Sequence, residues 1–255
     1  MWAWQETLFE EIYLTVFEKH EDIILLIEKF GFICQGKKEN GECVYVKNRK
    51  NIDYSTPRRA FPFIRPNFSS AGVLPIYSYY HDRLLPYSEL SNTNQEFWDE
   101  AAGNGITKDF IATPFAKSLE HLKEGNPVFL YRISNDKTSK TYKSCITSFA
   151  TITKRIIIKE SGRPNFNLKE FIEICGNKSI FSNEKLKKLY NKNKTLIVFE
   201  LVYNGFFGKG NNVIHKKLKE RGLFDKYPYE IVYSKDEFID ILEMGNKRAE
   251  NIIID

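Results

Sequence analysis

Residues Glu124–Ile133, with the sequence EGNPVFLYRI, decide the fold that we expect for most of this chain. A Gly-Asn-Pro turn leads into a short apolar run that ends in Tyr131 and Arg132. After a polar gap at residues 135–140, a second run rich in β-branched and aromatic residues extends over 142–158. Two such runs joined by a loop predict a hairpin within a curved sheet or barrel.

The length and composition of the chain limit the class of protein. With 255 residues, 42% of them hydrophobic, it can form one large domain or two small ones. It contains no apolar run of about 18 residues, so we expect no membrane-spanning helix. The first residues, MWAWQE, lack the basic and apolar regions of a secretory signal, and the cysteines lack CxxC spacing. These features predict a cytoplasmic protein with reduced thiols.

The net charge of +5 is unevenly distributed along the sequence. Residues 1–50 contain 7 basic and 9 acidic residues, whereas the remainder contains 31 basic and 24 acidic ones. The segment 178–225 alone contains 11 basic and 4 acidic residues. A basic region favours an anionic partner, most simply nucleic acid, although the lysines between 185 and 194 could also form an ordinary solvated surface.

Local signals in the first fifty residues predict a strand, a helix and a hairpin in that order. The β-prone run 12–17 predicts the strand, and apolar residues at helical spacing predict a helix that ends at Gly31. The expected buried face of this helix consists of Ile23, Leu26, Ile27 and Phe30. The dipeptide Asn40-Gly41 predicts the turn of a hairpin between two further strands.

This order of elements carries a resemblance to a known superfamily. Residues 12–32, IYLTVFEKHEDIILLIEKFGF, together with the hairpin, resemble the C-terminal third of a GNAT-superfamily acyltransferase over residues 10–48. In that superfamily a Gly-rich pyrophosphate loop precedes the strand, but residues 1–11 contain no glycine. The resemblance therefore implies a degenerate, non-catalytic half without bound acetyl-CoA. Its exposed sheet edge could be covered by the rest of the chain or by a second copy in a homodimer.

The segment after the hairpin is rich in proline, arginine and aromatic residues. Residues 57–66, PRRAFPFIRP, cannot form a regular helix and predict an extended connector. Arg58, Arg59 and Arg65 could stack on bases and grip phosphates, or they could pin the connector by ion pairs. The following cluster of Tyr80 and neighbouring aromatic residues with His81 could line a pocket, or its polar groups could be satisfied by backbone in a packed segment.

A second resemblance covers most of the remaining chain. Residues 116–132, AKSLEHLKEGNPVFLYR, and 144–152, SCITSFATI, are similar to the PUA-like superfamily, in particular to EVE and ASCH domains. Asn126 stands where that superfamily usually has Asp, and the Trp and Arg-Asn signature of EVE domains is absent. The two resemblances together imply an α+β chain. It would have a partial GNAT-like unit at residues 1–52 and a PUA-like β-barrel with flanking helices at 53–255, with the Pro-rich connector at its start.

The PUA-like resemblance implies a nucleic-acid-binding cleft between the barrel and its helices. A tyrosine offers a stacking face, hydroxyls reach base edges, and cations meet phosphates. The candidate binding residues are Arg65, Tyr80, Lys117, Ser118, Tyr131, Arg132, Lys143 and Ser144. For Tyr131 and Arg132 the alternative is that they only end a strand, pack and form ion pairs.

We therefore expect a module that binds RNA or DNA, a modified base included, with no cofactor, no metal and no membrane partner. One alternative is a small ASCH-type hydrolase acting on a modified nucleoside, for which Lys117, Thr147 and Glu124 are the loosely mapped candidates. Another is an acetyltransferase-related toxin–antitoxin or phage-defence accessory protein that works through protein contacts.

Overall fold

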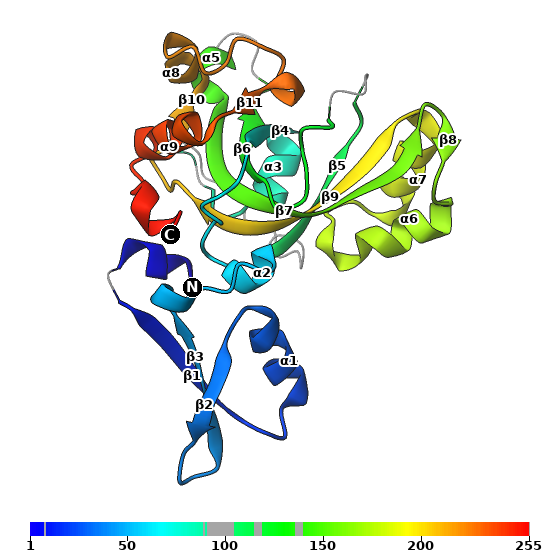
Figure 1. Cartoon of the computed structure of the whole chain (residues 1–255). Coiled ribbons are helices and arrows are strands. Elements are labelled where there is room, and N and C mark those ends of the chain that lie inside the picture. Colours follow the sequence, from blue (N-terminus) through cyan, green and yellow to red (C-terminus); the bar gives the residue numbers. More distant parts are fainter. Residues whose placement is uncertain (8, 89, 91–104, 115–118, 136–139, 255) are drawn as a thin grey trace. The chain divides into compact units, whose positions relative to one another are not determined.

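A computed structural model describes the chain apart from residues 8, 89, 91–104, 115–118, 136–139 and 255 (Figure 1). It contains two compact units, which are described one at a time. Unit 1 consists of Met1–Asn67 together with Ala249–Asp255, and unit 2 consists of Phe68–Arg248. Unit 1 thus extends past residue 52, where the sequence analysis ended the first domain, and it includes the C-terminal segment.

Unit 1 is built around a three-stranded antiparallel sheet in the order β1-β3-β2. Its main elements are β1 (Glu11–Phe17), α1 (Glu21–Lys29), β2 (Ile33–Lys37) and β3 (Glu42–Asn48). The strand, helix and hairpin predicted from the sequence are confirmed, and Gly41 occupies the turn with φ 88°. Such a positive φ favours glycine because it carries no Cβ atom.

The buried face of α1 differs from the predicted one. Ile24, Ile27 and Phe30 pack against the cluster formed with the sheet, whereas Ile23 and Leu26 are 45% and 54% exposed. Two adjacent apolar stripes run along this helix, and spacing alone does not tell which of them faces the sheet.

Lys47 ties the connector of unit 1 to the hairpin. Its ammonium group donates hydrogen bonds of 2.5–2.6 Å to the carbonyl oxygens of Phe30, Arg59 and Phe61. The remaining elements are short: η1 (Trp2–Glu6), η2 (Arg49–Asn51), α2 (Pro57–Ala60) and η5 (Ala249–Asn251). The connector thus contains one turn of helix, capped by the Thr56 hydroxyl, rather than being extended throughout.

Unit 2 is organised around one large sheet. Its central path runs β11-β4-β6-β7-β9-β5, and β8 and β10 pair with β7 outside this path. The strands are β4 (Ala71–Tyr77), β5 (Thr107–Ala112), β6 (Pro127–Ile133), β7 (Cys145–Glu160), β8 (Arg163–Pro164), β9 (Leu196–Phe206), β10 (Val213–Ile214) and β11 (Val232–Tyr233). The pair β4–β6 is parallel, and the other pairs are antiparallel.

The closed barrel expected from the sequence is not formed by the described residues. The path ends at β11 on one side and at β5 on the other. β11 is two residues long and pairs only with the start of β4, so it offers too little edge to meet a further strand. Register shifts opposite β6 and β9 help β7 to bend along its length, which curves the sheet without closing it (Figure 1). The fold is therefore α+β with a curved, open sheet.

Helices flank this sheet, and several of them begin where the sequence places a cap. They are α3 (Ser78–Leu84), α5 (Lys140–Lys143), α6 (Leu168–Cys175), η3 (Gly176–Lys178), α7 (Asn183–Lys192), α8 (His215–Glu220), η4 (Pro228–Glu230) and α9 (Lys235–Met244). The side chains of Asn167, Ser182 and Ser234 accept hydrogen bonds from backbone N–H groups in the first turns of α6, α7 and α9. Asn and Ser are among the preferred N-cap residues, so these caps follow from the local sequence.

Other predicted boundaries are displaced. The second β-run begins at Cys145 rather than Tyr142, because Lys140–Lys143 form α5. The β-prone residues 228–233 do not form one strand but the short helix η4 followed by β11. Residues 97–102, whose sequence favours a short helix or a turn, lie outside the described residues. Within the described ranges, no helix has the length and apolar character needed to span a lipid bilayer.

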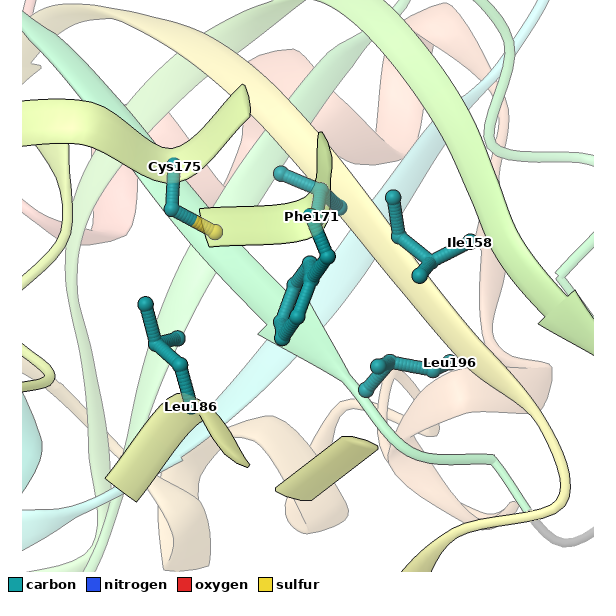
Figure 2. Close-up of a cluster of buried hydrophobic side chains, with 6 residues drawn as sticks. Ile158, Phe171, Cys175, Leu186 and Leu196 are labelled. Atoms are coloured by element: carbon teal, nitrogen blue, oxygen red, sulfur yellow. The ribbon is translucent and has the colours of Figure 1, made fainter. Parts of the chain in front are cut away.

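One buried cluster packs α6 and α7 against the C-terminal end of β7 and the N-terminal end of β9 (Figure 2). It consists of Ile158, Phe171, Cys175, Leu186, Leu196 and Val198. Burying each large apolar side chain contributes roughly 1.5–3 kcal/mol. Phe181 and Ile111 pack against the cluster, so it also positions the segment that precedes α7 beside β5.

Candidate functional site

Tyr131, a predicted base-stacking residue, points into the protein. Its hydroxyl group lies 3.0 Å from Nδ1 of His215, and its ring lies 4.6 Å from that of Phe224. Burial raises the pKa of Tyr131 to about 12. Its ring face is therefore occupied by the protein itself.

Arg132 is held in a bidentate ion pair. Its Nε and one terminal nitrogen each lie 2.8 Å from a different carboxylate oxygen of Asp82. Burial of Asp82 opposes its ionisation, but hydrogen bonds from Arg132 and His81 outweigh this effect and lower the pKa of Asp82 to about 2. A planar guanidinium matches a carboxylate in this geometry, so Arg132 is committed to Asp82.

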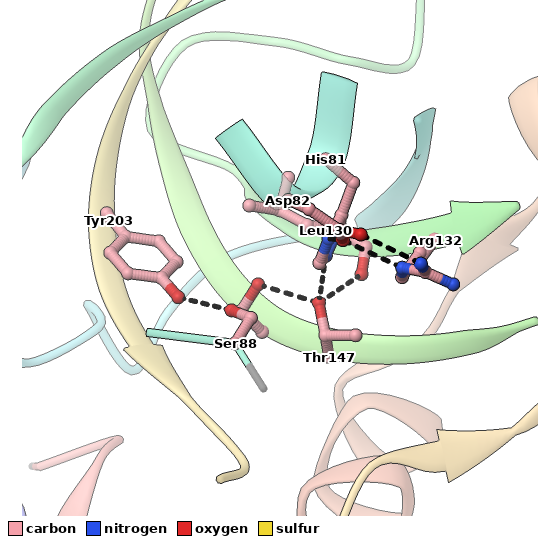
Figure 3. A network of polar contacts seen from close by, with 8 residues as sticks. His81, Asp82, Ser88, Leu130, Arg132, Thr147 and Tyr203 are labelled. Atoms are coloured by element: carbon pink, nitrogen blue, oxygen red, sulfur yellow. Dashed lines mark hydrogen bonds and ion pairs between the residues drawn. The ribbon is translucent and has the colours of Figure 1, made fainter. Parts of the chain in front are cut away.

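His81 extends this pair into a buried chain of hydrogen bonds (Figure 3). Its Nδ1 lies 2.8 Å from Asp82 and its Nε2 lies 2.7 Å from the hydroxyl of Thr147. Burial lowers the pKa of His81, and the carboxylate favours the neutral tautomer with its proton on Nδ1. We call His81, Asp82, Arg132 and Thr147 the Asp82 network. It fastens α3 to β6 and β7.

The other predicted site residues are spread over the chain. Ser144 is buried, and its hydroxyl accepts a hydrogen bond of 3.0 Å from the backbone N–H of Ser134. Lys143 is exposed on α5. Arg65 is exposed and belongs to unit 1. Lys117 and Ser118 lie outside the described residues.

Of the residues mapped for a hydrolase, Thr147 and Glu124 lie far apart, and Lys117 lies outside the described residues. Thr147 is buried in the Asp82 network, whereas Glu124 is exposed and accepts a hydrogen bond from the backbone N–H of Arg155. Thr147 and Arg155 are eight residues apart along β7, at most roughly 26 Å and still far beyond hydrogen-bond reach where the strand bends. Direct proton transfer between Thr147 and Glu124 is excluded at that distance.

Tyr80 lines a cavity of about 200 Å³, which we call the Tyr80 pocket. Its walls come from β4, α3, β5, η4 and the start of α7. Its aromatic and charged lining residues are Tyr77, Tyr80, Phe110, Phe181, Tyr229, Asp109 and Lys185. The Tyr80 and Phe181 rings pack edge to face at 5.1 Å, and Nζ of Lys185 lies 5.8 Å from the centre of the Tyr80 ring.

Asp109 gives this pocket an unusual charge environment. Its side chain is 1% exposed, and in the described part of the chain neither carboxyl oxygen has a hydrogen-bond partner. The nearest cation, Nζ of Lys178, lies 3.5 Å from Asp109 but 2.6 Å from Glu200. Burial, supported by the neighbouring Glu200 and opposed by Lys178, raises the pKa of Asp109 to about 7.

Sequence reasoning identified Tyr80 but missed Asp109, Phe181, Lys185 and Tyr229. One signal was present: Asp109 and Glu200 are single acidic residues inside otherwise β-prone runs, where a charge needs a specific reason. The lysines near 185 form a run that, in the sequence alone, indicates only a basic surface and not a pocket wall.

No protein-family model matches the chain, and no curated protein sequence does either. Among solved structures, the crystal structure of ASCH from Zymomonas mobilis is similar at 10% identity and a TM-score of 0.41, covering 68% of this chain and 93% of that one. Two mutants of the same protein give 11% and 9% identity with the same TM-score, over 95% and 96% of their chains. Likeness at this level does not establish a family, so the PUA-like and GNAT-like assignments remain predictions.

Proposed function

We propose that unit 2 binds single-stranded nucleic acid by taking one base into the Tyr80 pocket. The observation that carries this proposal is an aromatic cavity with a lysine at its wall, in a region rich in basic residues. A base stacked on an aromatic side chain gains roughly 1–3 kcal/mol, and every base has a face that can stack.

The size of the pocket fits a single flat ring. Its volume of about 200 Å³ is below the roughly 300–1,000 Å³ of pockets for drug-sized ligands. The Tyr80 ring and the Tyr229 ring both line it, and the hydroxyl of Tyr229 is buried enough to raise its pKa. A planar base is a suitable occupant for such walls.

Cations for the phosphates are available on the neighbouring helix. Lys185 of α7 lines the pocket, and Lys187 and Lys188 are exposed on the same helix. Lysines near a base pocket contribute affinity without sequence preference, since they contact the phosphate backbone.

In this proposal Arg132 has a positioning role. Tyr80 precedes His81 and Asp82 on α3, and the Asp82 network fastens that helix to the sheet. Arg132, which the sequence analysis assigned to direct contact with nucleic acid, would then position the helix that carries Tyr80.

The test is a titration of fluorescently labelled single-stranded RNA and DNA with the purified chain at about 50 and 200 mM salt. Tyr80→Ala should weaken binding by about tenfold through the loss of a stacking face. Lys185→Gln should weaken binding to all sequences and reduce the salt slope by about one.

Matched controls are Tyr142→Ala and Lys235→Gln. Tyr142 is an exposed tyrosine on α5, and Lys235 lies at the start of α9, so neither contributes to the pocket. The proposal is wrong if the unmodified chain binds no single strand at low salt, or if Tyr80→Ala binds as well as Tyr142→Ala.

A further inference from the structure

Asp109 is buried in the protein and yet borders the Tyr80 pocket. Asp109, Ile111 and Thr113 alternate along β5 and its extension, so they share one face of the strand, and all three line the cavity together with Phe110 between them. The alternate residue Lys108 lies on the opposite face, with its Nζ 5.2 Å from the ring centre of Tyr203.

The groups around Asp109 leave its oxygens without hydrogen bonds. Lys178 of η3, Glu200 of β9, Lys154 of β7 and Cys175 of α6 face it. Lys178 donates to one oxygen of Glu200 at 2.6 Å, and Thr153 donates to the other at 2.8 Å. Glu200 is thereby satisfied, whereas Asp109 receives only the more distant charge of Lys178 at 3.5 Å.

A buried carboxyl group without hydrogen bonds is rare, because each such group costs roughly 1–3 kcal/mol. At the wall of a ligand-sized cavity, a ligand can supply the missing partners. We propose that Asp109 reads the edge of the bound base and selects bases with an amino group beside an unprotonated ring nitrogen, as in cytosine and adenine.

This inference rests on the proposed function and names the class of base. A protonated carboxyl group presents an O–H donor beside a C=O acceptor. The ring nitrogen accepts from the O–H, and the amino group donates to the C=O. Uracil presents a carbonyl oxygen where cytosine and adenine present the ring nitrogen. This oxygen is a less basic acceptor than the ring nitrogen. An ionised carboxylate would prefer the two adjacent donors of guanine.

The protonation state of Asp109 near neutral pH allows this choice. Burial and Glu200 raise its pKa to about 7, and enclosing a base would remove more water and favour the neutral form further. Binding of cytosine and adenine should therefore weaken as the pH rises from about 6 to about 8.5. If an ionised carboxylate recognised guanine instead, binding of guanine would strengthen over the same range.

The experiment uses short single strands in which one variable base is flanked by abasic positions. With the unmodified chain at pH 6, the cytosine and adenine strands should bind roughly fivefold more tightly than the uracil strand, which corresponds to weakening one hydrogen bond by about 1 kcal/mol. Asp109→Leu should abolish this preference. Asp109→Asn places an amide donor and acceptor at the same positions, so it should keep the preference and lose the pH dependence.

Melting temperatures of both variants control for folding, and Asp109→Asn keeps the shape of the side chain. Equal binding of all four bases, a guanine preference that grows with pH, or an unchanged preference in Asp109→Leu would overturn the inference. If these results appear while Tyr80→Ala still weakens binding, base binding stands and only the role of Asp109 falls. If no strand binds, both fall.

Discussion

The Asp82 network and the Tyr80 pocket place aspartates of unit 2 in opposite situations. Asp82 receives two hydrogen bonds from Arg132 and one from His81, and its pKa is lowered to about 2. Asp109 has only the long 3.5 Å contact with Nζ of Lys178 among the described residues, and its pKa is raised to about 7. Burial acts against the charge of both, so the difference comes from their partners.

This contrast separates a structural acid from a candidate recognition group. A buried charge with a complete set of partners holds neighbouring elements together, here α3, β6 and β7. A buried acid that borders a cavity and has only one long contact with a cation retains the capacity to bind a ligand. Substitutions in the network should therefore reduce stability, and substitutions at Asp109 should change pH dependence and base preference.

The largest expected effect is on stability and follows from removing the guanidinium group of Arg132. Arg132→Leu leaves the carboxylate of Asp82 largely buried without its bidentate partner, which should cost about 3 kcal/mol of unfolding free energy. Arg221→Leu is the control, because it breaks an exposed ion pair with Asp240 and should cost under about 0.5 kcal/mol. Denaturant unfolding measures both variants. Equal losses of unfolding free energy would show that the Arg132–Asp82 pair stabilises the fold no more than an exposed ion pair.

A smaller effect concerns the pH dependence of stability. Asp109 stays protonated in the folded chain up to about pH 7, whereas its unfolded pKa is near 3.8. The folded state therefore binds more protons in this window, so the stability that Asp109 contributes at low pH is lost as the pH rises through about 7.

Asp109→Asn removes this titration. Between pH 5 and pH 7 the unfolding free energy of the unmodified chain should fall by roughly 2 to 3 kcal/mol more than that of the variant. Denaturant unfolding at both pH values gives the comparison, and parallel pH profiles would show that Asp109 is ionised throughout.

The smallest expected effect concerns the end of the network. Thr147→Val preserves shape but removes the hydroxyl that lies 2.7 Å from Nε2 of His81, which should cost about 1–2 kcal/mol. The preference among bases should be unchanged, because Thr147 does not line the pocket. A changed base preference with unchanged stability would place Thr147 in recognition rather than support.

Local rules predicted many of the individual elements. The strand over 12–17, the helix that follows it and the Asn-Gly turn at 40–41 each depend on a few neighbouring residues. Such signals act over one turn or one strand, so they can be read without knowing what packs nearby.

The candidate site depended on contacts between distant segments. Tyr131 and Arg132 end a strand as expected, but α3 and α8 bring Asp82 and His215 against them and turn both side chains inward. The pairing of β5 with β9 sets Asp109 opposite Glu200, and the α6–α7 cluster helps to form the pocket wall.

The sequence by itself thus determined the local elements, the basic character of the second half and the α+β class. Only the tertiary structure decided that the sheet stays open, that Arg132 faces Asp82, and that Asp109 lies unsatisfied beside a cavity. The physical reason is range: caps, turns and alternation act between near neighbours, whereas burial, pKa and cavities arise from surfaces that meet only after folding.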